Sequence, residues 1–131
     1  MKVNNFTLIN MMHILKNFSE KKLPQKISYA IMKNIYIINK DAEIYEDSLR
    51  KIIDSYKDYT IKDEQLENGL PKVDDEHMED YVSEINELLN FEVDIDLYYI
   101  DEDVFDYEDS ARYDAVSASD LIQLRAILCE E

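Results

Sequence analysis

A long heptad repeat of apolar residues constrains the fold of this chain more than any other feature of its sequence. Two apolar series recur every seven positions and lie four residues apart: Ile31, Ile38, Tyr45 and Ile52, and then Ile35, Ala42, Leu49 and Tyr56. This spacing predicts a helix with one apolar stripe, beginning near Pro24 and running to about residue 59. Such a helix would span ~52 Å at 1.5 Å per residue. Its stripe must therefore be covered either by other elements of the same chain or by a second copy.

Three shorter helices are predicted from apolar residues at three- and four-residue steps, at positions 7–20, 75–90 and 119–129. Each begins at a side chain that can accept a hydrogen bond from a backbone amide: Thr7, Asp74, and Ser117 or Ser119. One glycine and two prolines in 131 residues leave little material for long loops.

The segment 91–98 alternates between apolar and polar residues, which is typical of a half-buried strand. Its predicted inward side chains are Phe91, Val93, Ile95 and Leu97. The candidate pairing partners are residues 2–5 and the region 60–73, where Asn68-Gly69 favours a turn or a short irregular hairpin. We expect one α+β domain over residues 1–131 that is predominantly helical. A long central helix would carry shorter packed helices and a small two- or three-stranded sheet.

Negative charge is concentrated in the C-terminal half of the chain. Residues 1–72 hold 10 acids and 12 bases, whereas residues 73–131 hold 20 acids and 2 bases, for a total net charge of −16. Such a field repels nucleic acids and membrane surfaces and attracts basic partners. No segment approaches the ~20 apolar residues of a membrane span, and no signal-peptide pattern opens the chain. We expect a protein of the cytoplasm.

Residue types that catalyse reactions are scarce. The chain has two histidines, one cysteine (Cys129) and a single glycine, so neither a nucleophile paired with a base nor a glycine-rich phosphate loop is indicated. The acids of 101–109 are of the kind that Ca²⁺ prefers, but Asp106 and Arg112 stand where a calcium loop starting at Asp101 needs Gly and Glu. We expect no enzyme, no cofactor and no dedicated metal site, with a divalent-cation protein as a minor alternative.

Several short motifs carry a resemblance. They are residues 22–29 (KLPQKISY), 33–35 (KNI), 43–46 (EIYE), 49–51 (LRK), 84–89 (EINELL) and 119–121 (SDL). In this order they resemble a family of small uncharacterised proteins encoded by phages and prophages of Gram-positive bacteria. The resemblance implies a phage protein that works in the cytoplasm of a bacterial host, and it implies no site residues because the family has no known function. The segment 101–116 departs from the family in length and acidity, which favours it as the functional part.

Acids and interleaved tyrosines predict a surface that imitates nucleic acid. On a strand, Glu92, Asp94 and Asp96 would share one face at a spacing of ~6.7 Å, while DNA carries a phosphate every ~3.4 Å of each strand. The predicted partner-binding residues lie within 74–114: Glu79, Asp80, Glu84, Glu92, Asp94, Asp96, Tyr98, Tyr99, Asp101, Glu102, Asp103, Asp106, Tyr107, Glu108 and Asp109.

Charge and resemblance together lead to one hypothesis about function. The chain is predicted to be an acidic inhibitor, of the anti-CRISPR or anti-restriction type, that binds a basic host protein such as a CRISPR effector or restriction enzyme. It would contact neither nucleic acid nor membrane. The alternative is a homodimeric phage scaffold or morphogenesis adaptor assembled through the heptad helix, residues 30–56. A solvated acidic surface that only keeps the protein soluble remains the simplest explanation.

Overall fold

One long helix carries the rest of the fold in the computed structural model, which describes residues 1–108 and 111–130. Four α-helices occur among these residues: α1 (Asn5–Ser19), α2 (Gln25–Ser55), α3 (Asp75–Asn90) and α4 (Ala118–Leu128). Two antiparallel pairs of short strands accompany them: β1 (Lys2–Asn4) with β4 (Glu92–Asp94), and β2 (Thr60–Gln65) with β3 (Pro71–Val73). Two 3₁₀ turns complete the fold: η1 (Lys57–Tyr59) and η2 (Glu102–Phe105). The fold is α+β and mainly helical, as predicted.

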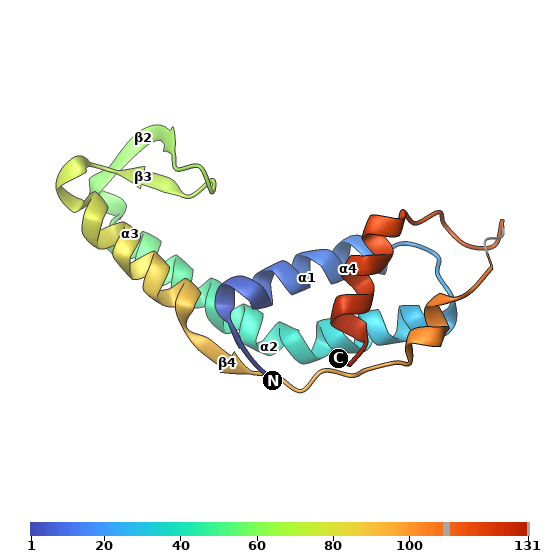
Figure 1. The fold of residues 1–131 in the computed structure, drawn as a ribbon. Coiled ribbons are helices and arrows are strands. Elements are labelled where there is room, and N and C mark those ends of the chain that lie inside the picture. The colour runs from blue at the N-terminus through green and yellow to red at the C-terminus, as the bar shows by residue number, and fades with distance from the viewer. Residues whose placement is uncertain (109–110, 131) are drawn as a thin grey trace.

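The helices are arranged along α2, so that the molecule is elongated (Figure 1). α1 packs on the N-terminal half of α2 and α4 packs on α1, while α3 runs beside the C-terminal half of α2. The β2–β3 hairpin lies at one end of the molecule. From β4, the chain returns along α2 in an extended conformation and reaches η2 at the opposite end.

Side-chain caps set the starts of the shorter helices. The carboxylate of Asp74 accepts a 3.0 Å hydrogen bond from the amide of His77, so the predicted cap of α3 is confirmed. Of the two candidates for α4, Ser117 is the cap and Ser119 is not. The predicted cap at Thr7 is wrong. The side chain of Asn4 accepts a 2.8 Å hydrogen bond from the Thr7 amide, and α1 therefore begins two residues earlier.

The alternating segment forms a strand only in its first part. β4 pairs with β1, with Val93 opposite Val3, so of the two candidate partners residues 2–5 form the pair, while the strands of 60–73 pair with each other. Ile95 and Leu97 are buried as expected, but Phe91 is 65% exposed and its predicted inward position is wrong. Phe91 is the C-cap of α3, so the alternation begins only after it.

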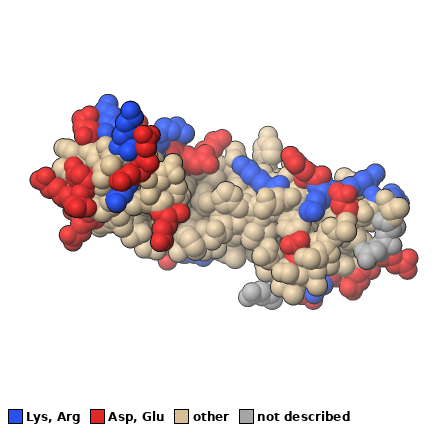
Figure 2. Space-filling view, turned by 90° about the horizontal axis from the view of Figure 1, so that it is seen from above, with Lys and Arg blue, Asp and Glu red and all other residues tan. Residues whose placement is uncertain are grey.

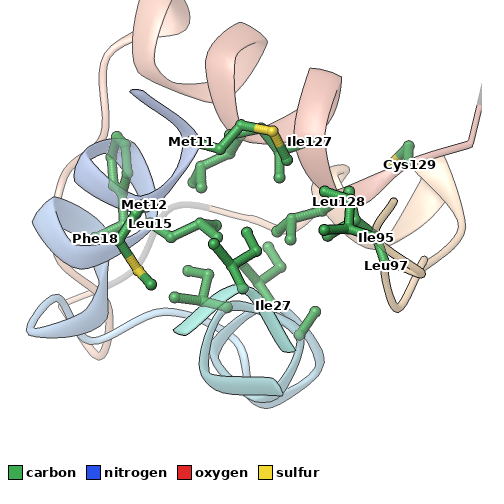
Figure 3. Packing of buried hydrophobic residues seen from close by; sticks show 14 of the residues in the cluster. Met11, Met12, Leu15, Phe18, Ile27, Ile95, Leu97, Ile127, Leu128 and Cys129 are labelled. Carbon is green, nitrogen blue, oxygen red and sulfur yellow. The ribbon is translucent and has the colours of Figure 1, made fainter. Parts of the chain in front are cut away.

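The larger of two hydrophobic clusters lies between α1, α4, the N-terminal half of α2 and the extended segment after β4. Figure 3 labels ten of its side chains: Met11, Met12, Leu15, Phe18, Ile27, Ile95, Leu97, Ile127, Leu128 and Cys129. The extended segment thus contributes side chains to the same core as the helices, and its course is fixed by their burial.

A smaller cluster joins α3 to the C-terminal half of α2. Its buried members are Val73, Tyr81 and Ile85. The Tyr81 ring packs edge-on against Tyr56 with 5.0 Å between centroids, and its hydroxyl donates a 2.8 Å hydrogen bond to the carbonyl of Pro71. One side chain therefore ties α3 to both α2 and the hairpin.

Tyr56 makes the stability of this end of the molecule sensitive to alkaline pH. Its hydroxyl donates a 2.5 Å hydrogen bond to Glu84, and this bond, followed by desolvation and the negative charges nearby, raises the pKa of Tyr56 to about 12. The folded-state pKa lies above the unfolded value of 10.0, so the stabilisation is complete below pH 10 and is lost as pH rises toward 12.

We expect Tyr56→Phe to lose less stability than the parent between about pH 9 and about pH 11.5, measured by urea denaturation. The remaining tyrosines titrate in both proteins, so only Tyr56 can make their losses of stability differ. Equal losses would therefore contradict a role for this bond.

Candidate functional site

The predicted acidic residues are spread over the length of the molecule. Glu79, Asp80 and Glu84 lie on α3 beside the hairpin, whereas the acids from Glu92 onward follow β4 and the extended chain to η2 at the other end (Figure 1). Figure 2 shows charged side chains gathered at both ends of the molecule, with a largely uncharged surface between them on the face shown, and at the hairpin end acidic and basic side chains are mixed. The spread arises because α3 packs on the C-terminal half of α2 and the chain then runs back along the helix. Residues 74–114 therefore do not gather their acids at one place.

Exposed carboxylates without intervening bases follow residues 92–108. We call these carboxylates the acidic ridge: Glu92, Asp94, Asp96, Asp101, Glu102, Asp103, Asp106 and Glu108. The apolar residues between them point inward: Val93 is half-buried, and Ile95, Leu97 and Phe105 are buried. Asp109 was predicted as a further member and lies outside the described residues.

A buried asparagine holds the middle of the acidic ridge. Asn34 on α2 is 0% exposed, and its amide nitrogen donates a 2.8 Å hydrogen bond to the carbonyl of Tyr98. The amide of Tyr98 donates a 2.7 Å hydrogen bond back to the side-chain oxygen of Asn34. This pair of bonds satisfies both backbone groups of a residue that has no strand partner, and a buried backbone group without a partner is costly.

Backbone hydrogen bonds hold the acidic ridge on either side of this clamp. The amide of Ile95 donates to the carbonyl of Met1 at 2.9 Å, and the amide of Ile100 donates to the carbonyl of Leu128 at 2.8 Å. The N-terminal amine lies 3.1 Å from a carboxylate oxygen of Asp94, and both groups are exposed, so this ion pair contributes little. The acids of residues 92–102 therefore extend from a backbone that is fixed at several points.

The tyrosines predicted as anchors pack against the protein itself. The ring of Tyr98 meets Tyr29 edge-on at 5.8 Å between centroids, and Tyr107 meets Tyr113 edge-on at 5.5 Å. Tyr99 is half-buried against the larger cluster. Each ring is thus only partly accessible, and its position is fixed by neighbours in the same chain.

A shallow hollow lies where the acidic ridge passes the start of α2. It is lined by Gln25, Lys26, Tyr29, Tyr98, Tyr99, Ile100, Asp101 and Val104. The ammonium group of Lys33 lies 4.6 Å from the ring centroid of Tyr98, within the range of a cation–π contact. Sequence reasoning missed Lys26, Tyr29 and Asn34 because nothing in their spacing indicates that α2 lies beside residues 98–104.

The environment of Cys129 and the arrangement of possible metal ligands bear on what chemistry the described residues could support. Cys129 is buried, and burial, followed by the nearby charge of Glu102, raises the pKa of its thiol, which disfavours the reactive thiolate. Within residues 1–108 and 111–130, no three histidine, cysteine or acidic side chains converge in a way that could hold a metal ion. In the same ranges, no helix combines the length and the apolar content that a membrane crossing requires.

The heptad stripe of α2 is covered within its own chain. Ile31, Ile38 and Ala42 belong to the larger cluster with α1, and Leu49 and Ile52 pack against the smaller cluster with α3. A second copy could reach this stripe only by displacing α1 or α3. Of the two sequence-based interpretations of the stripe, packing within the chain describes the structure.

Comparison with known proteins gave no match. No family model matches the chain, and no curated protein or solved structure matches it either. The resemblance to phage proteins stays a prediction from short motifs.

Proposed function

We propose that the protein is a non-catalytic inhibitor that binds a basic, nucleic-acid-handling protein of a bacterial host through the acidic ridge. The observation that carries this proposal is the combination of exposed carboxylates with a fixed backbone along residues 92–102. A segment that merely kept the protein soluble would need no buried clamp such as the one between Asn34 and Tyr98.

Fixed carboxylates have two advantages for binding a cationic surface. Their combined field accelerates encounter with a basic partner. Their backbone is already ordered, so binding does not have to supply the conformational entropy of ordering it. A groove that evolved to hold phosphates is lined by Lys and Arg and would accept such a row of negative groups. The aromatic hollow beside Asp101 adds apolar contact area at one side of the acidic ridge.

We infer the class of partner from the motif resemblance and from the charge. A phage protein with this surface would act in the host cytoplasm on a CRISPR effector or a restriction enzyme, by occupying the channel in which nucleic acid lies. It would bind the effector and leave the nucleic acid itself untouched, because like charges repel.

Two triple charge reversals test the proposal. The first is Glu92→Lys, Asp96→Lys and Asp103→Lys on the acidic ridge, which leaves Asp94 and its ion pair in place. The matched control is Glu79→Lys, Asp80→Lys and Glu87→Lys on α3, where all three acids are also exposed. Each triple changes the net charge by the same amount, so only position distinguishes them. Circular dichroism checks that both variants keep the parent's helical content.

The measurement is retention of purified basic candidates, such as CRISPR effectors and restriction enzymes, on the immobilised protein at low and high salt. We expect the ridge triple to lower affinity by more than about tenfold and the α3 triple by no more than about twofold. Retention by the parent should weaken with salt, because the screening length falls from ~10 Å at 0.1 M to ~3 Å at 1 M. Equal loss in both triples would show that the acids act only through total charge, and the proposal would then fail.

A further inference from the structure

The outer face of α2, opposite its buried stripe, carries large apolar side chains in solvent. Tyr29 is 54% exposed, Met32 51%, Tyr36 85% and Ile44 55%. Single exposed apolar residues are common and need no explanation. Here four of them lie on one face of one helix. Three of them, Tyr29, Met32 and Tyr36, line a shallow, mainly apolar hollow on α2 together with Lys33 and Ile37.

Charged side chains on the same face follow a definite order. Lys33 and Lys40 lie toward the N-terminal end of this face, and Glu43 and Asp47 lie toward its C-terminal end, all four exposed. From Tyr29 to Asp47 the face is ~27 Å long at 1.5 Å per residue. Over this stretch the bases precede the acids, so the pattern is complementary to itself when it is reversed. Arg50 follows within α2 and forms an exposed 3.2 Å ion pair with Asp47, which a second copy would share or replace.

We propose that this face binds a second copy of the chain, with the two α2 helices antiparallel across a two-fold axis near Lys40. In this arrangement Lys33 of one copy lies opposite Asp47 of the other, and Tyr36 lies opposite Ile44, each contact occurring twice. The two Lys40 side chains meet near the axis, and each is long enough to reach Glu43 of the other copy one turn away.

The direction of pairing follows from charge. A parallel pair would place lysine beside lysine and carboxylate beside carboxylate, which is unfavourable, whereas the antiparallel pair opposes unlike charges. Aromatic residues and methionine are enriched at the centres of protein interfaces, and this face provides Tyr29, Met32 and Tyr36.

This dimer is not the coiled-coil dimer that the heptad stripe would form. The heptad stripe is buried inside each copy, so α1 and α3 keep their places and the outer face alone makes the contact. The carboxylates of the acidic ridge take no part in it, but Tyr29 also lines the hollow beside Asp101. Tyr36 does not line that hollow, so Tyr36→Glu should abolish the dimer without weakening binding to a basic partner, and the two losses are separate results for this variant.

The first test is the mass in solution by sedimentation equilibrium over a wide range of concentration. The parent should reach twice the 15.6 kDa of one chain, and Tyr36→Glu should remain a monomer. Tyr36 is 85% exposed, so this substitution leaves the fold of each copy unaffected. The matched control is Ile122→Glu on α4, which is 66% exposed, lies away from α2's outer face and should dimerise like the parent. A parent that stays monomeric, or a Tyr36→Glu variant that still dimerises, would overturn the proposal.

The second test uses two complementary charge variants. Lys33→Glu with Lys40→Glu makes the face wholly acidic, and Glu43→Lys with Asp47→Lys makes it wholly basic. Each variant alone should be monomeric through repulsion, and an equimolar mixture should dimerise. Lys33 and Asp47 are ~21 Å apart along one helix and cannot meet within a chain, so rescue by mixing requires contact between copies. A mixture that remains monomeric would contradict the antiparallel arrangement.

Discussion

Replacing Asn34 with leucine is expected to lower the free energy of unfolding by about 2–4 kcal/mol. The side chain is fully buried and makes both hydrogen bonds to the backbone of Tyr98. Leucine has a similar volume but leaves the amide and the carbonyl of Tyr98 without partners, and each buried unpaired group costs about 1–3 kcal/mol. The measurement is equilibrium urea denaturation followed by circular dichroism.

Asn39 provides the matched control on the same helix. It is exposed and donates a 3.1 Å hydrogen bond to Glu43. Asn39→Leu should change stability by no more than about 0.5 kcal/mol, because water replaces the lost partner. If Asn34→Leu were as mild as Asn39→Leu, the clamp on Tyr98 would not stabilise the fold.

Replacing Tyr81 with alanine is expected to cost about 3–5 kcal/mol, as for other large aromatic residues removed from a core. Tyr81 is 0% exposed, and the other buried members of its cluster among the described residues are Val73 and Ile85, with half-buried side chains packed around them. Removing the ring leaves a cavity at the centre of this small cluster. The change should appear in urea denaturation and, by hydrogen exchange, first in the amides of α3 rather than in those of α1.

Tyr81→Phe separates the two contributions of this side chain. It keeps the ring that packs on Tyr56 and removes only the hydroxyl that donates to Pro71. The expected cost is about 1 kcal/mol, the usual net value of one hydrogen bond. If Tyr81→Ala cost no more than Tyr81→Phe, ring packing would not hold α3 on α2.

Local sequence patterns predicted the parts of the fold that depend on local rules. The heptad stripe predicted α2 because burial of one face of a long helix imposes a period that is visible in the sequence. Asp74 predicted the start of α3 for a similar reason, since a cap acts within three residues. Alternation from Val93 to Leu97 predicted which side chains of the extended segment point inward.

Features that join distant parts of the chain were not predictable in this way. Asn34 and Tyr98 are 64 residues apart, and no periodicity distinguishes Asn34 from a surface asparagine. The spread of the acids was equally hidden, because it depends on α3 packing beside the far half of α2. The position of Phe91 was missed because α3 extends to Asn90, and the alternating pattern overlapped its end by one residue.

Amide hydrogen exchange can show whether the acidic ridge is presented on a backbone held in one conformation. The residues to follow are Ile95, Tyr98 and Ile100, whose amides donate to Met1, Asn34 and Leu128. We predict that these three amides exchange as slowly as buried amides of α1, through opening of the larger cluster, although they lie outside any strand pairing. Exchange at the rate of an unstructured chain would show that the acidic ridge is not fixed, and the proposed mode of binding would then lose its structural basis.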